Sequence, residues 1–274
     1  MERRKEEKSR FHGFGLFIFF LVCGILIFVS PVLIKELYRT MYSVFIPILF
    51  LVIITLIYLS KNLKSYFPVF LAFLVASLVY SPQLFLGPGT TIEGKTYTTF
   101  LTALLVVLPI ILITKISGKE MSSIYLNKGN LRLGLIIGLA TFLFFLVTSV
   151  PASIWIFGGK EISRDRLISL TPWIALFVFS NAIKEEILFR GLFLKKYEYF
   201  LGATPSNVLQ ATIFSLAHLY LPFDSFLPLY LFMTFLLGLA FGAVMQKTDS
   251  ALAAILFHAG ADIPVILAVF SLLS

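Results

Sequence analysis

Charged residues and cysteines are scarce in this sequence. Only 13% of its 274 residues are charged and 59% are hydrophobic, whereas soluble globular domains have about 25% charged and 45–50% apolar residues. The single cysteine, Cys23, excludes a disulfide within this sequence and a thiolate metal cluster. Because no soluble domain of useful size remains outside the hydrophobic runs, the composition indicates a membrane protein.

The sequence also lacks a basic stripe or a nucleic-acid recognition module. Its net charge is +8, but the basic residues lie mostly between hydrophobic runs, where the positive-inside rule places them in any case. We therefore expect no nucleic-acid partner. The expected environment is a lipid bilayer.

Hydrophobic runs of about 20 residues recur along the whole sequence. Each is long enough to cross a hydrocarbon core of about 30 Å. The first run is too long for a signal peptide and lacks a small-residue cleavage pattern, so we expect it to be retained. The sequence therefore predicts an all-α, polytopic helical membrane protein with eight or nine transmembrane helices. The candidate spans are 12–34, 41–60, 66–86, 97–116, 131–157, 171–190, 205–222, 226–247 and 250–273.

The distribution of Lys and Arg between alternate loops predicts the orientation. One side carries Arg3, Arg4, Lys5, Lys8, Arg10, Lys61, Lys64, Lys115, Lys119, Lys128, Arg132, Lys195, Lys196 and Lys247. The other side carries Lys35, Arg39, Lys95, Lys160, Arg164 and Arg166. This excess favours a cytoplasmic N-terminus.

Small residues follow a GxxxG spacing in two of the predicted spans. The pairs are Gly134 with Gly138, and Gly238 with Gly242. This spacing is typical of helices that approach each other closely in a membrane. We interpret both pairs as packing positions, not as parts of a site.

Ionisable residues within the spans are concentrated in the second half of the chain. They are Glu185 and Glu186 in the sixth span, His218 in the seventh, and His258 with Asp262 in the ninth. Such residues are costly at membrane depth and are candidates for function. A rise of about 1.5 Å per residue puts these polar groups roughly 12 to 20 Å from the cytoplasmic ends of their spans. The common depth predicts one intramembrane site among the C-terminal helices.

Helical spacing indicates which of these side chains face one another. Glu186 and Arg190 are four residues apart and can form an ion pair. Glu185 is turned about 100° from Glu186, which leaves it available for chemistry. His258 and Asp262 also share a face, so the carboxylate can orient the imidazole.

Three motifs give the sequence a family resemblance. Residues 185–190 read EEILFR, residues 214–218 read FSLAH, beginning with Phe214, and residues 258–262 read HAGAD. These resemble, in order, the EExxxR, FxxxH and HxxxN/D motifs of the CAAX protease and bacteriocin-processing family, which includes CAAX prenyl protease 2 type intramembrane endopeptidases. The resemblance covers residues 171–266. It divides the chain into N-terminal transmembrane helices (1–165) and a catalytic helical core (166–274).

The resemblance implies a role for each motif residue. Glu185 and His218 would activate a water molecule that attacks the scissile amide, and His258 with Asp262 would stabilise the oxyanion. An ionised Asp cannot donate a hydrogen bond as Asn does, so we expect Asp262 to orient His258, which then acts as the donor. Asn181, one turn before Glu185, is expected to form a hydrogen bond within the site.

The implied function is an intramembrane endopeptidase that cuts near the C-terminus of a prenylated (CAAX-type) or other membrane-bound peptide. Its cavity would open toward the cytoplasmic side, so the expected partners are this lipid-modified peptide and the bilayer. No cofactor is expected, because the resemblance implies metal-independent glutamate chemistry.

Three alternatives stay open. A non-catalytic scaffold or bacteriocin-immunity protein of the same family would bind partners without cleaving them. A zinc-dependent membrane protease could use the same Glu, His and Asp side chains as ligands, although the sequence has no HExxH motif. A proton-coupled transporter also places Glu and His at mid-membrane, but such transporters typically contain inverted repeats, which we do not find here.

Overall fold

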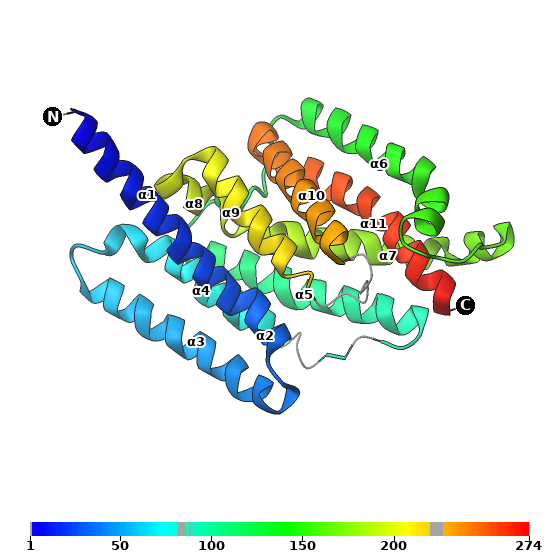
Figure 1. Cartoon of the computed structure of the whole chain (residues 1–274), viewed down its shortest axis with the longest axis horizontal. Helices are drawn as coiled ribbons and strands as arrows, with labels where there is room; N and C mark the ends of the chain where they lie inside the picture. The colour runs from blue at the N-terminus through cyan, green and yellow to red at the C-terminus, as the bar shows by residue number, and fades with distance from the viewer. Residues whose placement is uncertain (1, 82–85, 88, 220–226, 274) are drawn as a thin grey trace. The chain divides into compact units, whose positions relative to one another are not determined.

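The fold is entirely helical over the described part of the chain. We analysed a computed structural model, which describes residues 2–81, 86–87, 89–219 and 227–273, with the side chains described from residue 13 onward. No strand occurs within these ranges, which confirms the predicted all-α class (Figure 1). The helices are α1 (Glu2–Gly24), α2 (Ser30–Leu33), α3 (Glu36–Leu59), α4 (Phe67–Tyr80), α5 (Ile92–Ile116), α6 (Leu131–Trp155), α7 (Arg164–Glu185), α8 (Leu194–Leu201), α9 (Ala203–Leu216), α10 (Leu227–Thr248) and α11 (Ala251–Leu273). The π-helices η1 (Ile25–Val29) and η5 (Glu186–Gly191), and the 3₁₀-helices η2 (Lys64–Tyr66) and η4 (Met121–Ile124), interrupt or connect them.

Seven helical segments of the described residues are long and apolar enough to cross a membrane. They are Gly13–Leu33, Glu36–Leu59, Ile92–Ile116, Leu131–Trp155, Arg164–Leu201, Leu227–Thr248 and Ala251–Leu273. The segment Lys64–Tyr80 is apolar but shorter. The chain is therefore a multi-pass integral membrane protein, as predicted.

The span expected at 205–222 differs from its prediction. It corresponds to α9, which begins at Ala203 and is only 14 residues long. At about 1.5 Å per residue this helix is too short to cross a hydrocarbon core by itself. Residues 220–226 of the expected span lie outside the described residues. The seven long segments and Lys64–Tyr80 together correspond to the lower predicted number of eight.

The described helices group into two compact units. Unit 1 comprises residues 1–85 and 192–242, and unit 2 comprises residues 86–191 and 243–274. The functional boundary expected between residues 165 and 166 stays a prediction.

The interior of unit 1 is rich in aromatic side chains. Phe20 and Phe73 are completely buried, and Tyr197 of α8 stacks on Phe20 with ring centroids 5.4 Å apart. Phe193 stacks on Tyr197 at the same separation. Offset ring contacts of this kind add to the stabilisation that comes from burying their area. Phe73 of α4 also contacts Phe20 and Tyr197, with ring centroids 6.1 and 6.2 Å apart, so the aromatic rings join α1, α4 and α8 into one core.

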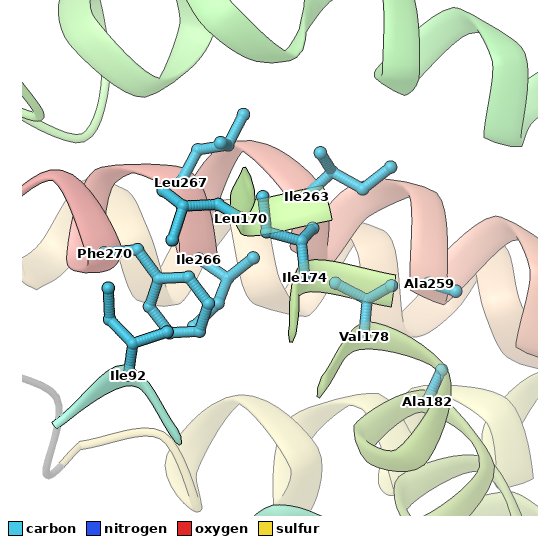
Figure 2. Close-up of a cluster of buried hydrophobic side chains, with 10 residues drawn as sticks. All are labelled: Ile92, Leu170, Ile174, Val178, Ala182, Ala259, Ile263, Ile266, Leu267 and Phe270. Carbon is cyan, nitrogen blue, oxygen red and sulfur yellow. The ribbon is translucent and has the colours of Figure 1, made fainter. Parts of the chain in front are cut away.

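The core of unit 2 is a seam between α7 and α11 that α5 covers at one end (Figure 2). On α7 every fourth residue points into the seam, as Figure 2 shows, and α11 contributes residues at matching helical spacing. Apolar residues at this spacing form the stripe along one face of a helix that packs against a neighbouring helix. The members are Ile92 of α5, Leu170, Ile174, Val178 and Ala182 of α7, and Ala259, Ile263, Ile266, Leu267 and Phe270 of α11. Ala182 and Ala259 are completely buried, and their small size lets the two helices approach closely.

Glycines bring α6 close to α11. A Cβ atom on Gly260 of α11 would lie 2.8 Å from the Cα of Phe142, and one on Gly138 of α6 would lie 2.9 Å from Leu256 Cδ1. A Cβ on Gly134 would contact Ala253 Cβ at 3.7 Å. The predicted packing role of the Gly134–Gly138 pair is therefore confirmed.

We predict that Gly260→Ala destabilises unit 2 by about 1–3 kcal/mol, because the added methyl group would meet helix backbone that cannot move without repacking. Intrinsic helix propensity acts in the opposite direction, since alanine favours helices over glycine. Thermal unfolding in detergent measures the effect. The control is Gly15→Ala in α1, where no neighbouring atom lies within 4 Å. Equal unfolding temperatures for the two variants would contradict the close approach of α6 and α11.

Candidate active site

The EExxxR motif lies where α7 changes from an α-helix to a π-helix. α7 ends at Glu185, and Glu186–Gly191 form the π-helix η5, in which all six residues are buried. Glu186 is four residues beyond Ala182 and so continues the stripe of α7 that faces α11. π-Helical segments are rare in proteins, and those that occur often lie at functional sites. The helix therefore carries its charged residues directly into the protein interior.

Glu186 is held by two basic side chains. Arg190 Nη1 donates to Glu186 Oε1 at 2.7 Å, and both side chains are completely buried, which confirms the predicted ion pair. His258 Nδ1 of α11 lies 2.7 Å from the same oxygen. A carboxylate can only accept hydrogen bonds, so this imidazole nitrogen is the donor. The two contacts fix the imidazole plane and join η5 to α11.

Glu185 has longer contacts and lies nearer the surface of the site. Its Oε2 is 3.6 Å from His258 Nε2, and its Oε1 is 3.7 Å from Lys184 Nζ. Glu185 is 8% exposed, whereas Glu186 is 0% exposed. Both distances exceed those of a direct hydrogen bond. The contacts of Glu185 with these two neighbours are therefore longer than those that Glu186 makes with Arg190 and His258.

Asp262 and Asn181 form the outer edge of the same group. Asp262 Oδ1 is 3.5 Å from His258 Nε2, so the predicted contact between these two residues is present. Asn181 Nδ2 of α7 donates to Asp262 Oδ2 at 2.9 Å. Both edge residues are half-buried. We refer below to Asn181, Lys184, Glu185, Glu186, Arg190, His258 and Asp262 as the polar cluster.

The polar cluster balances acidic against basic side chains. Glu185, Glu186 and Asp262 provide three carboxyl groups, and Lys184, Arg190 and His258 provide three basic groups within 4 Å of them. Charges removed from water are tolerated when they are paired. The side chains of the polar cluster can therefore bind a proton or accept one from a neighbouring group.

His218 and Phe214 belong to unit 1. Phe214 is in α9, whereas His218 lies in the turn that follows α9 and is half-buried. His218 Nδ1 is 2.7 Å from the carbonyl oxygen of Phe214, and the two rings meet edge to face with centroids 4.6 Å apart. Because the carbonyl only accepts, Nδ1 carries the hydrogen, and Nε2 is the basic nitrogen of the neutral ring. The participation of His218 in the site stays a prediction.

In the part of the chain that the structure describes, no group of three or more His, Cys, Asp or Glu side chains is arranged to hold a metal ion. The contacts within the polar cluster give the reason. Glu186 Oε1 already accepts from Arg190 and His258, and both nitrogens of His258 face carboxylates. The donor atoms therefore point at one another instead of at a common centre.

The sequence predicted a hydrogen bond of Asn181 within the site, but neither its partner nor the bond between His258 and Glu186. The bond between His258 and Glu186 joins residues 72 positions apart, and the bond between Asn181 and Asp262 joins residues 81 positions apart. Both depend on how α7 and α11 are rotated against each other, which helical periodicity does not specify. The only available signal was the common depth of the polar residues.

The fold and the polar cluster define a multi-pass membrane protein with a buried group of paired acidic and basic side chains. Comparison with protein-family models adds that residues 167–264 match the model described as Type II CAAX prenyl endopeptidase Rce1-like. The match covers all seven residues of the polar cluster and the FxxxH segment, and it confirms the resemblance predicted from the motifs. It supports a peptide hydrolase of the membrane. Neither the search of curated proteins nor the search of solved structures found a match.

We predict that Arg190→Met destabilises the protein by about 3–5 kcal/mol, because it leaves the fully buried Glu186 carboxylate with one partner fewer. The double variant Glu186→Gln/Arg190→Met removes both charges and should recover part of this loss. Thermal unfolding in detergent measures both. Arg132→Met, at an exposed position of α6, is the control. If Arg190→Met and Arg132→Met unfold at the same temperature, the ion pair does not support the fold.

Proposed function

We propose that this protein is an intramembrane endopeptidase in which Glu185 activates a water molecule for attack on a peptide bond. The observation that carries the proposal is the buried connection of Arg190, Glu186, His258 and Glu185 within the segment that matches the endopeptidase family model. Carboxylates and an imidazole that are fixed at membrane depth are the groups that water activation requires.

The reaction begins when a Glu185 oxygen accepts a proton from water. The water oxygen bonds to the carbonyl carbon of the scissile peptide bond, and the π electrons move to the carbonyl oxygen. When the resulting tetrahedral intermediate collapses, the C–N bond breaks and the proton passes to the leaving amine. The products are a carboxylic acid and an amine, which become a carboxylate and an ammonium when the acid's proton passes to the amine through solvent, and Glu185 is again ionised.

Glu185 suits the role of base better than Glu186. Glu186 accepts two hydrogen bonds of 2.7 Å and is completely buried. Glu185 is 8% exposed, and its contacts with the neighbouring His258 and Lys184 are 3.6 and 3.7 Å long. We therefore place the attacking water beside Glu185. In this proposal Glu186 and Arg190 support the site by holding His258.

The imidazoles would assist the same step. His258 has its Nδ1–H fixed on Glu186, so its Nε2 is held at the edge that Glu185 and Asp262 share. His218 presents Nε2 as its basic nitrogen and would share the proton of the water with Glu185, as the family resemblance implies. Phe214 would hold the His218 ring through its carbonyl oxygen and its aromatic edge.

The proposed substrate is a lipid-modified or otherwise membrane-bound peptide, cut near its C-terminus. The family description names CAAX prenyl endopeptidases, and a farnesylated CAAX peptide is the natural first probe. A multi-pass protein presents its site to groups that are already in the bilayer, which suits a prenyl chain. We propose that the chemistry needs no metal, since the donors of the polar cluster bind each other.

We predict that Glu185→Gln lowers the turnover of a farnesylated CAAX peptide by about 10²- to 10⁴-fold, because the amide cannot act as a general base. Turnover is measured by mass spectrometry with purified protein in detergent. Glu161→Gln, in an exposed loop of the same unit, is the matched control and should behave as wild type. Normal turnover by Glu185→Gln would refute the base assignment. Binding of the peptide by the wild-type protein without cleavage would favour the scaffold or immunity alternative.

We further propose that the N-terminus and the loop 117–130 face the cytoplasm. Ala251 N, at the start of α11, donates to Tyr125 O at 2.9 Å, and Lys160 N donates to Ser271 Oγ, near the end of α11, at 2.8 Å. The loops 117–130 and 156–163 therefore lie at opposite ends of a membrane-spanning helix. The first loop contains Lys119 and Lys128 and is flanked by Lys115 and Arg132, which the positive-inside rule assigns to the cytoplasm.

Single-cysteine variants test this orientation in a Cys23→Ser background. We predict that Ser117→Cys is protected from a membrane-impermeant thiol reagent in intact cells and reacts only after permeabilisation. Glu161→Cys should react directly. Both positions are exposed, so accessibility depends on the side of the membrane. The reverse labelling pattern would invert the proposed topology.

A further inference from the structure

The proposed reaction places a negative charge beside three carboxyl groups. When water attacks, the carbonyl oxygen becomes an oxyanion close to Glu185, Glu186 and Asp262. An oxyanion in such surroundings requires a hydrogen-bond donor that is fixed in place before the reaction. Asp262 has no N–H, and as a carboxylate it would repel the charge.

Most donors of the polar cluster are engaged by carboxylates. Arg190 is completely buried and donates to Glu186 at 2.7 Å. His258 donates from Nδ1 to Glu186, and its Nε2 faces both Glu185 and Asp262. The Lys184 ammonium lies beside the proposed base itself, 3.7 Å from its oxygen. These groups mainly balance the charges that are present before the reaction.

The side-chain amide of Asn181 is different. It is neutral, it is half-buried at the edge of the cluster, and it has two N–H bonds. One of them points to Asp262 Oδ2 over 2.9 Å. Because the carboxylate can only accept, this contact determines which end of the amide is nitrogen. The second N–H then points in a fixed direction away from Asp262.

Asn181 is also well placed relative to the proposed base. It precedes Glu185 by four residues on α7, so the two side chains project from the same face of the helix. Their Cβ atoms are about 5–6 Å apart at this spacing. That separation accommodates an attacking water next to Glu185 and the carbonyl oxygen next to Asn181.

We propose that Asn181 is a catalytic residue, whose second amide N–H donates to the oxyanion, and that Asp262 is the positioning residue that orients this amide. The inference rests on the proposed endopeptidase function and adds to it a donor outside the three family motifs. In the attack step, the carbonyl oxygen receives the π electrons and accepts the Asn181 hydrogen bond. The amide gives up no proton, and the bond weakens again when the C–N bond breaks.

The test compares Asn181→Ala with Asn127→Ala, using full-length protein in detergent and a farnesylated CAAX peptide. Asn127 is a matched control, because its Nδ2 also donates to an aspartate, Asp249 Oδ2, at 3.2 Å but in exposed loops outside the site. We expect Asn181→Ala to lower kcat by about 10²-fold with little change in KM, as for other single oxyanion donors. Asn127→Ala should retain wild-type kcat.

A double-mutant cycle tests the role of Asp262. If Asp262 acts through Asn181, then Asp262→Ala lowers kcat in the wild-type background. In the Asn181→Ala background the same substitution should lower kcat by less than about threefold more. Independent losses that multiply would overturn the positioning role. Thermal unfolding of every variant separates these effects from loss of the fold.

The remaining outcomes separate this inference from the proposed function. If Glu185→Gln is inactive but a folded Asn181→Ala retains its kcat, the donor role is overturned and the endopeptidase function stands. A loss confined to KM would also overturn the donor role, because it indicates ground-state binding. If the wild-type protein does not cleave the peptide, both are overturned.

Discussion

The carboxylate of Glu186 is the centre on which the polar cluster depends. Removing an ion from water costs several kcal/mol even after the surroundings relax, and this carboxylate is completely buried. Two short contacts offset the cost, one from Arg190 on the next turn of its own helix and one from His258 on α11. If either partner moved away, the buried carboxylate would lose one of its two short contacts. These contacts therefore fix η5 against α11.

The apolar seam makes this arrangement possible. Ala182 and Ala259, both completely buried, lie at the end of the seam that adjoins Glu186 and His258. Larger side chains there would separate the helices and lengthen the contacts between them. Gly260 lets α6 approach α11 closely as well. Packing of small residues and pairing of buried charges thus support each other in unit 2, and the same packing holds Asn181 opposite Asp262.

Local spacing and composition account for most of what was predictable from the sequence. The run lengths predicted the long helices, including α11, which continues through Pro264, because a membrane helix tolerates proline when neighbours satisfy its backbone. The four-residue spacing predicted the Glu186–Arg190 pair. The change to a π-helix at Glu186 involves only a shift in hydrogen-bond register, which leaves no pattern in the sequence. The His258–Glu186 contact depends on the mutual rotation of two helices, and the short α9 could not be distinguished from a span because apolar residues continue beyond its end.

In the proposed mechanism a buried carboxylate network hydrolyses peptide bonds in the membrane without a metal. The most direct measurement is cleavage of a farnesylated CAAX peptide by the purified wild-type protein after exhaustive treatment with a chelator, with the products identified by mass spectrometry. We expect one broken peptide bond near the C-terminus and an unchanged rate after chelation. Cleavage that is lost with the chelator and restored by zinc would contradict this mechanism.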